Sequence, residues 1–297
     1  MKNADRPWSQ EIQWYPGHMA KARRMIEENM KLVDVVCEIC DARIPRSSRN
    51  PDMEALAANK RRVIVLNRKD LADPVETGKW IKSLQETETK AIACDSRSRK
   101  GVASFLPAVE SLLQDRHSAE KEKGLVGRKP RIMVVGIPNV GKSSFINQLA
   151  GRKATVTGDR PGVTRGKQWI SVGAKWELMD TPGILWPKFD SWQVGAFLAL
   201  TNSIKNEILD YEALAVYFLE QMKEAYPDRL QERYHVPAAR ERTGEEILQD
   251  IARNRGCISS GGDPDLARAS RMLIKEYQDG KLGKLTLEKY NGGSLGT

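Results

Sequence analysis

Long apolar runs are absent from this sequence. No stretch of its 297 residues approaches the roughly 20 consecutive apolar residues that a transmembrane helix requires. The first residues are polar and charged, with Lys2, Asp5 and Arg6 among them, so they contain no apolar segment of the kind found in secretion signals. Internal repeats and long low-complexity tracts are also absent. We therefore expect a globular cytoplasmic protein that does not bind membranes.

Cysteine is scarce, with four residues in the whole chain. Two of them, Cys37 and Cys40, form a C-x-x-C pattern, but both lie within the apolar run of residues 32–40. On a β-strand, side chains three residues apart point to opposite faces, which argues against a shared metal ion or a redox pair. We therefore interpret both cysteines as core residues.

The charge is unevenly distributed along the chain. The formal net charge is +9, but residues 1–188 carry 34 Lys and Arg against 22 Asp and Glu, whereas residues 189–297 carry 14 against 17. Four basic clusters occur in the first part. They are Arg43, Arg46 and Arg49; Lys60, Arg61 and Arg62; Arg97, Arg99 and Lys100; and Arg152, Lys153, Arg160, Arg165 and Lys167. Any one of them is compatible with an ordinary solvated surface, but together they favour contact with nucleic-acid phosphates.

The most specific motif lies near the middle of the chain. Residues 136–143 read G-x-x-x-x-G-K-S, the loop whose backbone N–H groups, lysine and following helix hold nucleotide phosphates. Its context fits, because residues 131–135 are typical of a buried strand and residues 144–149 have the pattern of a helix. A chance match in a glycine-containing turn is the alternative. The motif predicts binding of a nucleoside triphosphate but does not indicate the base.

Strands and helices alternate through the first part of the chain. Runs typical of strands lie at residues 32–40, 62–67 and 91–94, and helical patterns lie at residues 19–31, 51–59, 74–85 and 102–113. This alternation predicts an α/β fold with a mostly parallel, doubly wound sheet. The polar, charge-rich residues 114–130 are expected to form an exposed connector before the strand that leads into the phosphate loop.

The pattern changes at about residue 190. From there only helices are predicted, at residues 191–202, 211–226, 244–253, 265–279 and 285–290, with turn signals between them. We therefore predict a nucleotide-binding α/β domain over residues 1–189 and a smaller all-α domain over residues 190–290. Residues 291–297 are rich in glycine and are expected to form a disordered tail.

Two further motifs indicate the nucleotide. Asp180 ends a predicted strand and begins Asp-Thr-Pro-Gly, a pattern in which the carboxylate reaches Mg²⁺ directly or through water. Asn67 and Asp70 lie three residues apart, as in the guanine-reading N-K-x-D motif, where a carboxylate accepts from guanine N1–H and N2–H₂ together. Arg68 replaces the usual lysine, and its stem and guanidinium plane can also stack on a base. N-x-x-D alone is compatible with a polar turn, but the three motifs together predict a GTP-binding protein.

The order of these motifs is inverted relative to ordinary small GTPases, because the base-reading motif precedes the phosphate loop. This order resembles a circularly permuted GTPase. Residues 14–22, Trp-Tyr-Pro-Gly-His-Met-Ala-Lys-Ala, closely resemble the N-terminal signature of the ribosome biogenesis GTPase A (YlqF/RbgA) family, and the similarity extends to about residue 290. The resemblance implies a GTPase that binds GTP and GDP and acts late in assembly of the large ribosomal subunit. Its implied partners are the subunit precursor, ribosomal RNA and neighbouring ribosomal proteins, and off the ribosome it is expected to be a monomer.

The resemblance also implies roles for individual residues. Lys142 and the backbone of the loop hold the phosphates. Ser143 and Asp180 are expected to bind Mg²⁺, and Thr164 is expected to become a further Mg²⁺ ligand only in the GTP state. Asn139 resembles the asparagine through which related GTPases hold K⁺, an ion that can replace part of the charge of an arginine finger. Cys94 and Asp95 stand where a base-contacting Ser-Ala segment is expected. The expected GTP-binding residues are Asn67, Arg68, Lys69, Asp70, Cys94, Asp95, Asn139, Val140, Gly141, Lys142, Ser143, Ser144, Thr164 and Gly183.

Ile184 follows Gly183, where many GTPases have the glutamine that orients the attacking water. An aliphatic side chain cannot orient water, so another group is needed. The resemblance implies that this group is the N-terminal histidine, His18, although a lone histidine is more often structural. We expect His18, Lys142 and Thr164 to be catalytic, and hydrolysis to depend on the ribosomal particle.

Other functions remain compatible with the sequence. The chain fits a GTP-regulated RNA-binding scaffold whose turnover is incidental. It also fits a GTPase that acts on tRNA or the small subunit, because basic clusters do not identify the RNA that they bind. Use of ATP is disfavoured by the guanine-reading carboxylate of Asp70.

Overall fold

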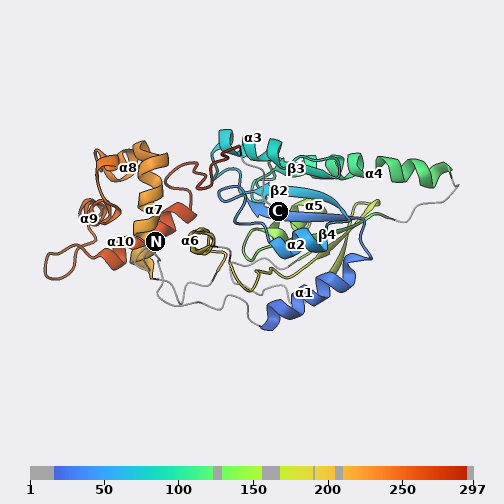
Figure 1. Cartoon of the computed structure of the whole chain (residues 1–297), viewed down its shortest axis with the longest axis horizontal. Coiled ribbons are helices and arrows are strands. Elements are labelled where there is room, and N and C mark those ends of the chain that lie inside the picture. Colours follow the sequence, from blue (N-terminus) through green and yellow to red (C-terminus); the bar gives the residue numbers. More distant parts are fainter. Residues whose placement is uncertain (1–16, 123–128, 156–167, 190, 205–209, 293–297) are drawn as a thin grey trace. The chain divides into compact units, whose positions relative to one another are not determined.

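The computed structural model describes residues 17–122, 129–155, 168–189, 191–204 and 210–292. The chain forms two compact units (Figure 1). One unit contains the sheet and includes the chain as far as Lys188, and the other is helical and spans Phe189–Leu287. From Glu288 the chain belongs again to the unit with the sheet. The division after Lys188 therefore lies where the sequence changes from alternating strands and helices to helices alone.

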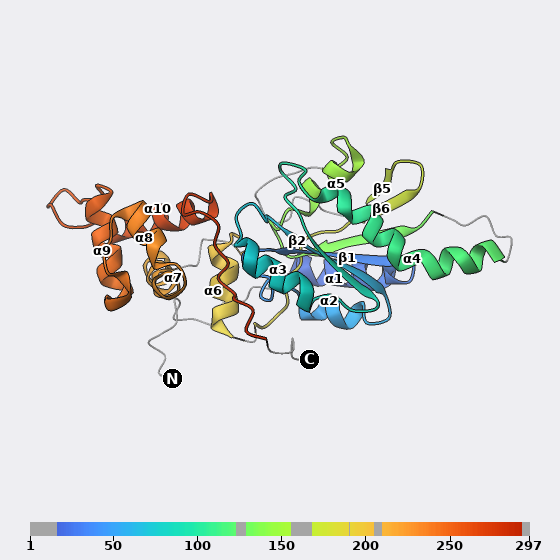
Figure 2. The same cartoon turned by 90° about the horizontal axis from the view of Figure 1, so that it is seen from above.

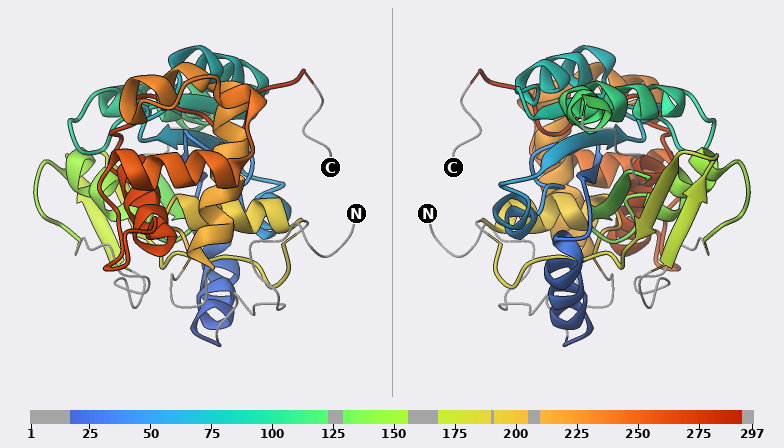
Figure 3. Two further views of the ribbon diagram at one scale, coloured as in Figure 1. Left: turned by 90° about the vertical axis from the view of Figure 1, so that its left-hand side faces the viewer. Right: turned by 90° about the vertical axis from the view of Figure 1, so that its right-hand side faces the viewer.

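In the described part of the chain, six strands form one sheet in the order β3-β2-β1-β4-β6-β5. They are β1 (Val35–Asp41), β2 (Arg61–Asn67), β3 (Thr89–Ala93), β4 (Arg131–Gly136), β5 (Gln168–Val172) and β6 (Trp176–Asp180). Neighbours are parallel except β5 and β6, which form an antiparallel pair at one edge of the sheet (Figure 3, right). The prediction of a mostly parallel α/β sheet is confirmed.

Helices cover both faces of the sheet, which explains why β1 is buried throughout and β2 is buried from Val63 to Asn67. The helices α1 (Gly17–Met30), α2 (Pro51–Leu56) and α3 (Pro74–Ser83) lie on one face, and α4 (Phe105–Glu122) and α5 (Lys142–Ala150) lie on the other (Figure 2). On the first face, Ile26 of α1 packs in a cluster with Met133 of β4, and Trp80 of α3 packs in a second cluster with Cys40. Cys37 and Cys40 are buried and free, as their interpretation as core residues requires.

Two predictions of local structure are wrong. The helix α4 continues to Glu122, so residues 114–122 are helical and do not belong to the exposed connector predicted for residues 114–130. This end of α4 projects beyond the sheet (Figure 1), where no apolar stripe is needed, so the hydrophobic period stops before the helix does. Residues 285–290, predicted as a helix, contain no helical turn.

The helical unit is built around α7 (Tyr211–Ala225), which is contacted by the helices α6 (Trp192–Leu200), α8 (Pro227–Tyr234), α9 (Gly244–Asn254) and α10 (Leu266–Gln278). Phe218 of α7 is fully buried, and its ring lies 4.8 Å from that of Tyr277 on α10. No helix is predicted between residues 226 and 244, so the sequence pattern missed α8, which begins at Pro227 as proline allows. As in the other described ranges, none of these helices is long and apolar enough to cross a membrane.

Residues 288–290, here called the C-terminal strap, return to the unit with the sheet. The Glu288 carboxylate accepts hydrogen bonds from the backbone N–H of Ser47, at 3.0 Å, and from its hydroxyl. The Glu288 carbonyl accepts from Trp80 Nε1 at 2.8 Å, and Tyr290 packs edge-on against the Trp80 ring. The strap therefore connects α3 with the loop that follows β1.

Candidate functional site

The predicted motifs lie at the carboxyl ends of neighbouring strands. From β1, the strands β2 and β3 extend the sheet in one direction, and β4, β6 and β5 extend it in the other. In doubly wound sheets, ligands bind at the carboxyl ends of the strands where this direction changes. The phosphate loop (residues 136–143) follows β4, the base-reading motif (residues 67–70) follows β2, and Asp180 ends β6. Three motifs that are separate in the sequence therefore meet at one end of the sheet.

The phosphate loop contains three residues with positive φ. Gly136, Asn139 and Gly141 have φ angles of 150°, 56° and 102°. At Gly141, a Cβ atom would lie 2.4 Å from Nδ2 of Asn67, so both the dihedral angle and the available space require glycine. The helix α5 begins directly after Gly141. Its N–H groups and the positive end of its dipole are therefore available to bind phosphate.

Lys142 supplies a buried cation to the loop. Its Nζ donates hydrogen bonds to the carbonyl oxygens of Gly136 and Ile137, at 3.0 and 2.8 Å. Burial lowers the pKa of Lys142 to about 8, and the negative charge of Asp180 opposes this effect only in part. The ammonium group is thus held inside the loop, where an anionic phosphate can bind it.

The segment that begins at Asp180 packs directly against the phosphate loop. Thr181 Oγ1 donates to the carbonyl oxygen of Val134 at 2.7 Å. A Cβ atom on Gly183 would lie 2.7 Å from Cα of Pro138 and 3.0 Å from Nζ of Lys142. Only glycine permits this approach, which brings the backbone of the segment beside the phosphate-binding lysine.

Asn67 connects three loops at the end of the sheet. Its Nδ2 donates to the carbonyl oxygen of Val140 at 2.8 Å. Its Oδ1 accepts from the backbone N–H and the hydroxyl of Ser96, at 3.0 and 2.8 Å, and from the thiol of Cys94 at 3.6 Å. Ser96 is not among the site residues expected from the sequence. Its position two residues after Cys94, in the segment that matches the expected Ser-Ala motif loosely, is the signal that points to it.

Arg68 joins the base-reading motif to the phosphate loop. One guanidinium nitrogen donates to the carbonyl oxygen of Asn139, and another lies 3.7 Å from the Asp41 carboxylate. Asp41 is buried and accepts two hydrogen bonds from the Arg43 guanidinium, at 2.9 and 2.8 Å. Burial opposes ionisation of Asp41, but the charge and hydrogen bonds of Arg43 outweigh it and hold the pKa of Asp41 below its usual value. Packing of the Arg68 stem against a base stays a prediction.

Lys69 and Asp70 differ in their surroundings. The backbone N–H of Lys69 donates to the carbonyl oxygen of Cys94 at 3.1 Å, so its main chain supports the loop after β3. Asp70 is exposed, so its carboxylate is accessible for the predicted contact with guanine.

The side chains of Cys94 and Asp95 make contacts within the protein. Burial raises the pKa of the Cys94 thiol to about 12, so the thiol is neutral. The Asp95 carboxylate accepts from the backbone N–H groups of Arg97 and Ser98, at 2.8 and 3.2 Å, and from the Ser98 hydroxyl. Burial raises the pKa of Asp95, but these hydrogen bonds outweigh it and lower the pKa overall. Contact of these two residues with the nucleotide stays a prediction.

Ile184 is fully buried and points into the core below α1. Its carbonyl oxygen accepts from Asn50 Nδ2 at 3.4 Å. The position after Gly183 therefore offers no polar side chain to a water molecule. His18 is the second residue of α1, but its side chain lies outside the described part of the structure, as does Thr164.

The donor atoms at this end of the sheet fit a magnesium ion. Ser143 lies in the first turn of α5, and Asp180 is buried at the end of β6. Hydroxyl and carboxylate oxygens are the hard ligands that Mg²⁺ binds, and it takes its remaining ligands from phosphates and water. In the described ranges, no group of three or more His, Cys, Asp or Glu residues is arranged to hold a metal ion.

The cations of the first two basic clusters are mostly buried or paired within the protein. Arg43 is fully buried, and the other members except Arg46 bind neighbouring groups. The partners are Glu38 and Glu54 for Arg49, the Val33 carbonyl for Lys60, Glu88 for Arg61, and Glu54 and Glu86 for Arg62. A sequence does not show which carboxylates neighbour a cation in the fold, so this pairing could not be foreseen, and contact of these residues with nucleic acid stays a prediction.

Comparisons with known proteins agree with this geometry. Residues 131–234 match the family described as "50S ribosome-binding GTPase". The chain is 46% identical over 277 residues to ribosome biogenesis GTPase A of Bacillus cereus, and the match covers 93% of each protein. It is 44% identical over 280 residues to the protein of the same name from Priestia megaterium, covering 93% of this chain and 96% of the relative. The chain belongs to the ribosome biogenesis GTPase A family.

Solved structures support the same assignment. A GDP-bound YlqF structure is 26% identical, with a TM-score of 0.66, and the match covers 89% of this chain and 98% of that one. A GNP-bound YlqF structure from Thermotoga maritima is 27% identical, with a TM-score of 0.63, and covers 91% and 98%. As a member of the ribosome biogenesis GTPase A family, this protein is a circularly permuted GTPase that binds guanine nucleotides and hydrolyses GTP.

Proposed function

We propose that this protein acts late in assembly of the large ribosomal subunit, binds precursor particles through ribosomal RNA, and is released after GTP hydrolysis. The description of the matching family and the names of its relatives support a role on the ribosome. We also propose that it acts in the cytoplasm and is a monomer away from the particle.

The burial of Ile184 is the observation that supports hydrolysis dependent on the particle. Its side chain is 0% exposed and packs with the α1 residues Ala22 and Ile26. A GTPase that has no polar side chain at this position needs another group to orient the attacking water, so its unassisted hydrolysis is slow. His18 is in the first turn of α1, the helix that packs on Ile184. We expect the particle to orient His18, so that hydrolysis occurs when assembly has presented the correct surface.

The ions have separate roles in this proposal. Ser143 and Asp180 hold Mg²⁺, and Thr164 joins them in the GTP state. Asn139 holds K⁺ at the phosphate loop. When bound, the two ions neutralise the charge that develops on the phosphates during hydrolysis.

The test is the rate of GTP hydrolysis with and without purified large-subunit precursor particles, in potassium and in sodium buffers. We expect the particles to stimulate hydrolysis at least about tenfold, with the higher rate in potassium. His18→Ala should lose the stimulation but bind GDP normally, whereas Lys142→Ala should lose nucleotide binding. Equal rates with and without particles, or full stimulation of His18→Ala, would contradict the proposal.

The same assay separates the alternatives. Stimulation by small-subunit particles or tRNA instead would assign the protein to another RNA. Binding and release of particles that are unchanged in Lys142→Ala would indicate a scaffold whose GTP turnover is incidental.

A further inference from the structure

Five cations are exposed beside the base-reading end of the sheet. Arg97, Arg99 and Lys100 lie on the loop after β3, and Arg152 and Lys153 follow α5. We call these five residues the basic surface. Within the described ranges, no salt bridge joins any of them to a carboxylate, in contrast to the paired cations of the first two clusters.

Hydrogen bonds fix both parts of the basic surface. The loop after β3 is closed by Asp95, whose N–H donates to the Lys100 carbonyl at 2.8 Å and whose carboxylate accepts from the N–H groups of Arg97 and Ser98. The turn after α5 is held by Asn147, whose Oδ1 accepts from the backbone N–H groups of residues 154 and 155, both at 2.8 Å. The cations therefore extend from ordered backbone.

The two parts are joined into one surface. Arg99 Nε donates to Oε1 of Gln148 on α5. Gln148 lies in the last turn of that helix, whose C-cap residue is Gly151, so Arg152 and Lys153 directly follow the end of the helix to which Arg99 is bonded. The ring centroids of Phe105 on α4 and Phe145 on α5 lie 5.0 Å apart, which holds these two helices together.

We infer that the basic surface binds the phosphate backbone of RNA. The inference rests on the proposed function, which supplies RNA as the polyanion. Closely spaced arginine and lysine side chains match the repeated charge of a nucleic-acid backbone. Base stacking needs exposed aromatic rings, and the large apolar residues that are exposed in the described ranges are Leu32, Val75 and Ile258, none of which belongs to this surface. The basic surface therefore recognises the charge and position of the RNA phosphates and not the base sequence.

The basic surface adjoins the nucleotide site but shares no residue with it. A Cβ atom on Gly101 would lie 2.7 Å from Nζ of Lys69, which places the base-reading motif next to the loop that carries Lys100. The phosphate-binding and base-reading side chains are Lys142, Asn67 and Asp70. Removal of the basic surface should therefore leave GDP binding intact.

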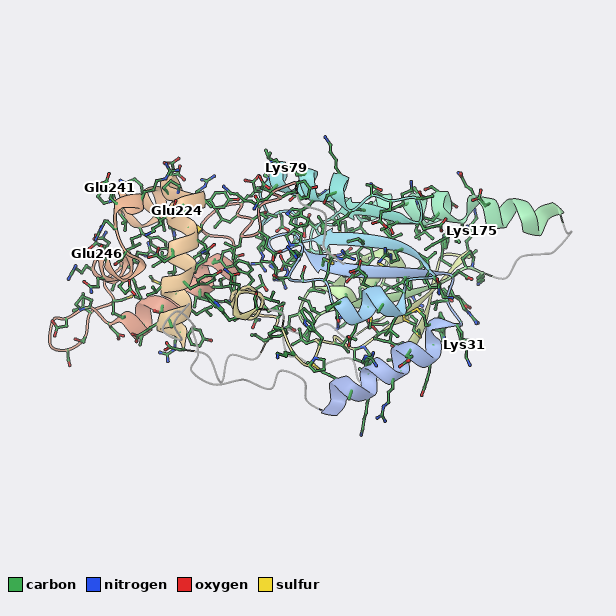
Figure 4. The ribbon with its side chains drawn as sticks, in the orientation of Figure 1. Lys31, Lys79, Lys175, Glu224, Glu241 and Glu246 are labelled. Carbon is green, nitrogen blue, oxygen red and sulfur yellow. The ribbon has the colours of Figure 1, made fainter. Side chains whose placement is uncertain are left out.

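The test compares two variants that each lose four positive charges. The first carries Arg99→Gln, Lys100→Gln, Arg152→Gln and Lys153→Gln. The matched control carries Lys31→Gln, Lys79→Gln, Lys82→Gln and Lys175→Gln. The control residues are exposed lysines of the same unit, and Figure 4 shows Lys31, Lys79 and Lys175 at three separate places on it.

Binding is measured as the affinity for a labelled single-stranded poly(U) and for a labelled RNA duplex, each about 20 nucleotides long, at several salt concentrations. Each phosphate contact contributes about −0.7 to −0.9 to the slope of log K against log salt. We therefore expect the first variant to lose about 3 units of slope and at least about tenfold in affinity for both RNAs. The control should lose less than about twofold, and both variants should bind a fluorescent GDP analogue like the wild type.

Cosedimentation with large-subunit precursor particles completes the test. The first variant should bind particles more weakly than the control does. Equal RNA affinity of the two variants would overturn the inference while the proposed function stands. Loss of particle binding with normal RNA binding would also overturn it, because the surface would then contact an acidic protein. If wild-type protein binds neither RNA nor particles, the proposed function itself fails.

Discussion

Lys142 determines how nucleotide binding should depend on pH. Burial lowers its pKa to about 8, so above this pH the free protein loses the proton of the ammonium group. Bound phosphates favour the charged form and raise the pKa again. The contribution of Lys142 to affinity is therefore complete below the pKa of the free protein and is lost as the pH rises toward the pKa of the complex.

Proton uptake measures this effect directly. At about pH 8.5 we expect GDP binding to take up more than half a proton, and at about pH 7 almost none. Isothermal titration calorimetry in two buffers with different ionisation heats gives the number of protons. The pH is kept low enough for guanine N1 to retain its own proton. Equal uptake at both pH values would contradict a lowered pKa for Lys142.

Gly183 is expected to tolerate no side chain. Gly183→Ala places a methyl group 2.7 Å from the backbone of Pro138, so the two loops must separate. We expect a loss of about 1–3 kcal/mol in the free energy of unfolding, measured with urea, together with weaker GDP binding. Gly78 is the matched control, because a Cβ atom there meets nothing within 4 Å and the residue lies inside α3. Gly78→Ala should stabilise the protein by about 0.5–1 kcal/mol, and a similar gain in Gly183→Ala would refute the steric argument.

At the scale of residues, the sequence predicted those site positions that belong to short linear motifs. Asn67 and Asp180 end strands, and Lys142 belongs to the loop that follows a third strand. Because parallel strands bring their carboxyl ends together, the motifs meet without further information. Ser96 and Asp41 could not be assigned in this way. Each acts through a partner that is near only in the folded chain, Asn67 for Ser96 and Arg68 for Asp41.

At the scale of elements, the C-terminal strap should stabilise the unit with the sheet. Glu288→Ala leaves the N–H groups of Arg46 and Ser47 without their acceptor, which we expect to cost about 1–3 kcal/mol of unfolding free energy. Glu288→Gln keeps an acceptor oxygen and should cost less. Urea unfolding of the three proteins at neutral pH tests this order, and equal stability of the alanine variant and the wild type would contradict it.

The pH dependence adds a second test of the strap. Burial raises the pKa of the Glu288 carboxyl in spite of its hydrogen bonds. The unfolded carboxyl therefore ionises at lower pH than the folded one, so its contribution to stability is present in acid and is lost as the pH rises through the folded pKa. Relative to the wild type, Glu288→Gln should gain stability as the pH rises from acid to neutral. A difference in unfolding free energy between the two proteins that stays constant with pH would show that the pKa of Glu288 is not raised.

The elements that sequence patterns missed share one physical cause. Hydrophobic periodicity reports only faces that pack on a core, and the end of α4 projects past the sheet. The helix predicted for residues 285–290 is the opposite case. These residues include apolar and aromatic ones, but the strap within them binds without helical turns, through backbone hydrogen bonds of Glu288 and Tyr290 and the Tyr290 ring. The buried strands were predicted well because both of their faces are covered, although their ends shifted by up to three residues.

At the scale of the whole molecule, the two units have separate cores. The sheet unit packs around Ile26 and Trp80, whereas the helical unit packs around Phe218 of α7. All nucleotide motifs belong to the sheet unit. A ligand that binds one folded unit stabilises that unit alone when the two unfold independently.

We therefore expect two transitions in differential scanning calorimetry, only one of which responds to GDP. At a GDP concentration about 100 times Kd, the sheet unit gains about 2.7 kcal/mol, and its Tm should rise by roughly 5–10 °C. Phe218→Ala should lower the other transition alone, since loss of a fully buried ring costs about 3–5 kcal/mol. If GDP and Phe218→Ala both shift one common transition, the two units unfold together. Nucleotide binding would then stabilise the helical unit through this cooperative unfolding, and not only through the chain segments that follow Lys188 and precede Glu288.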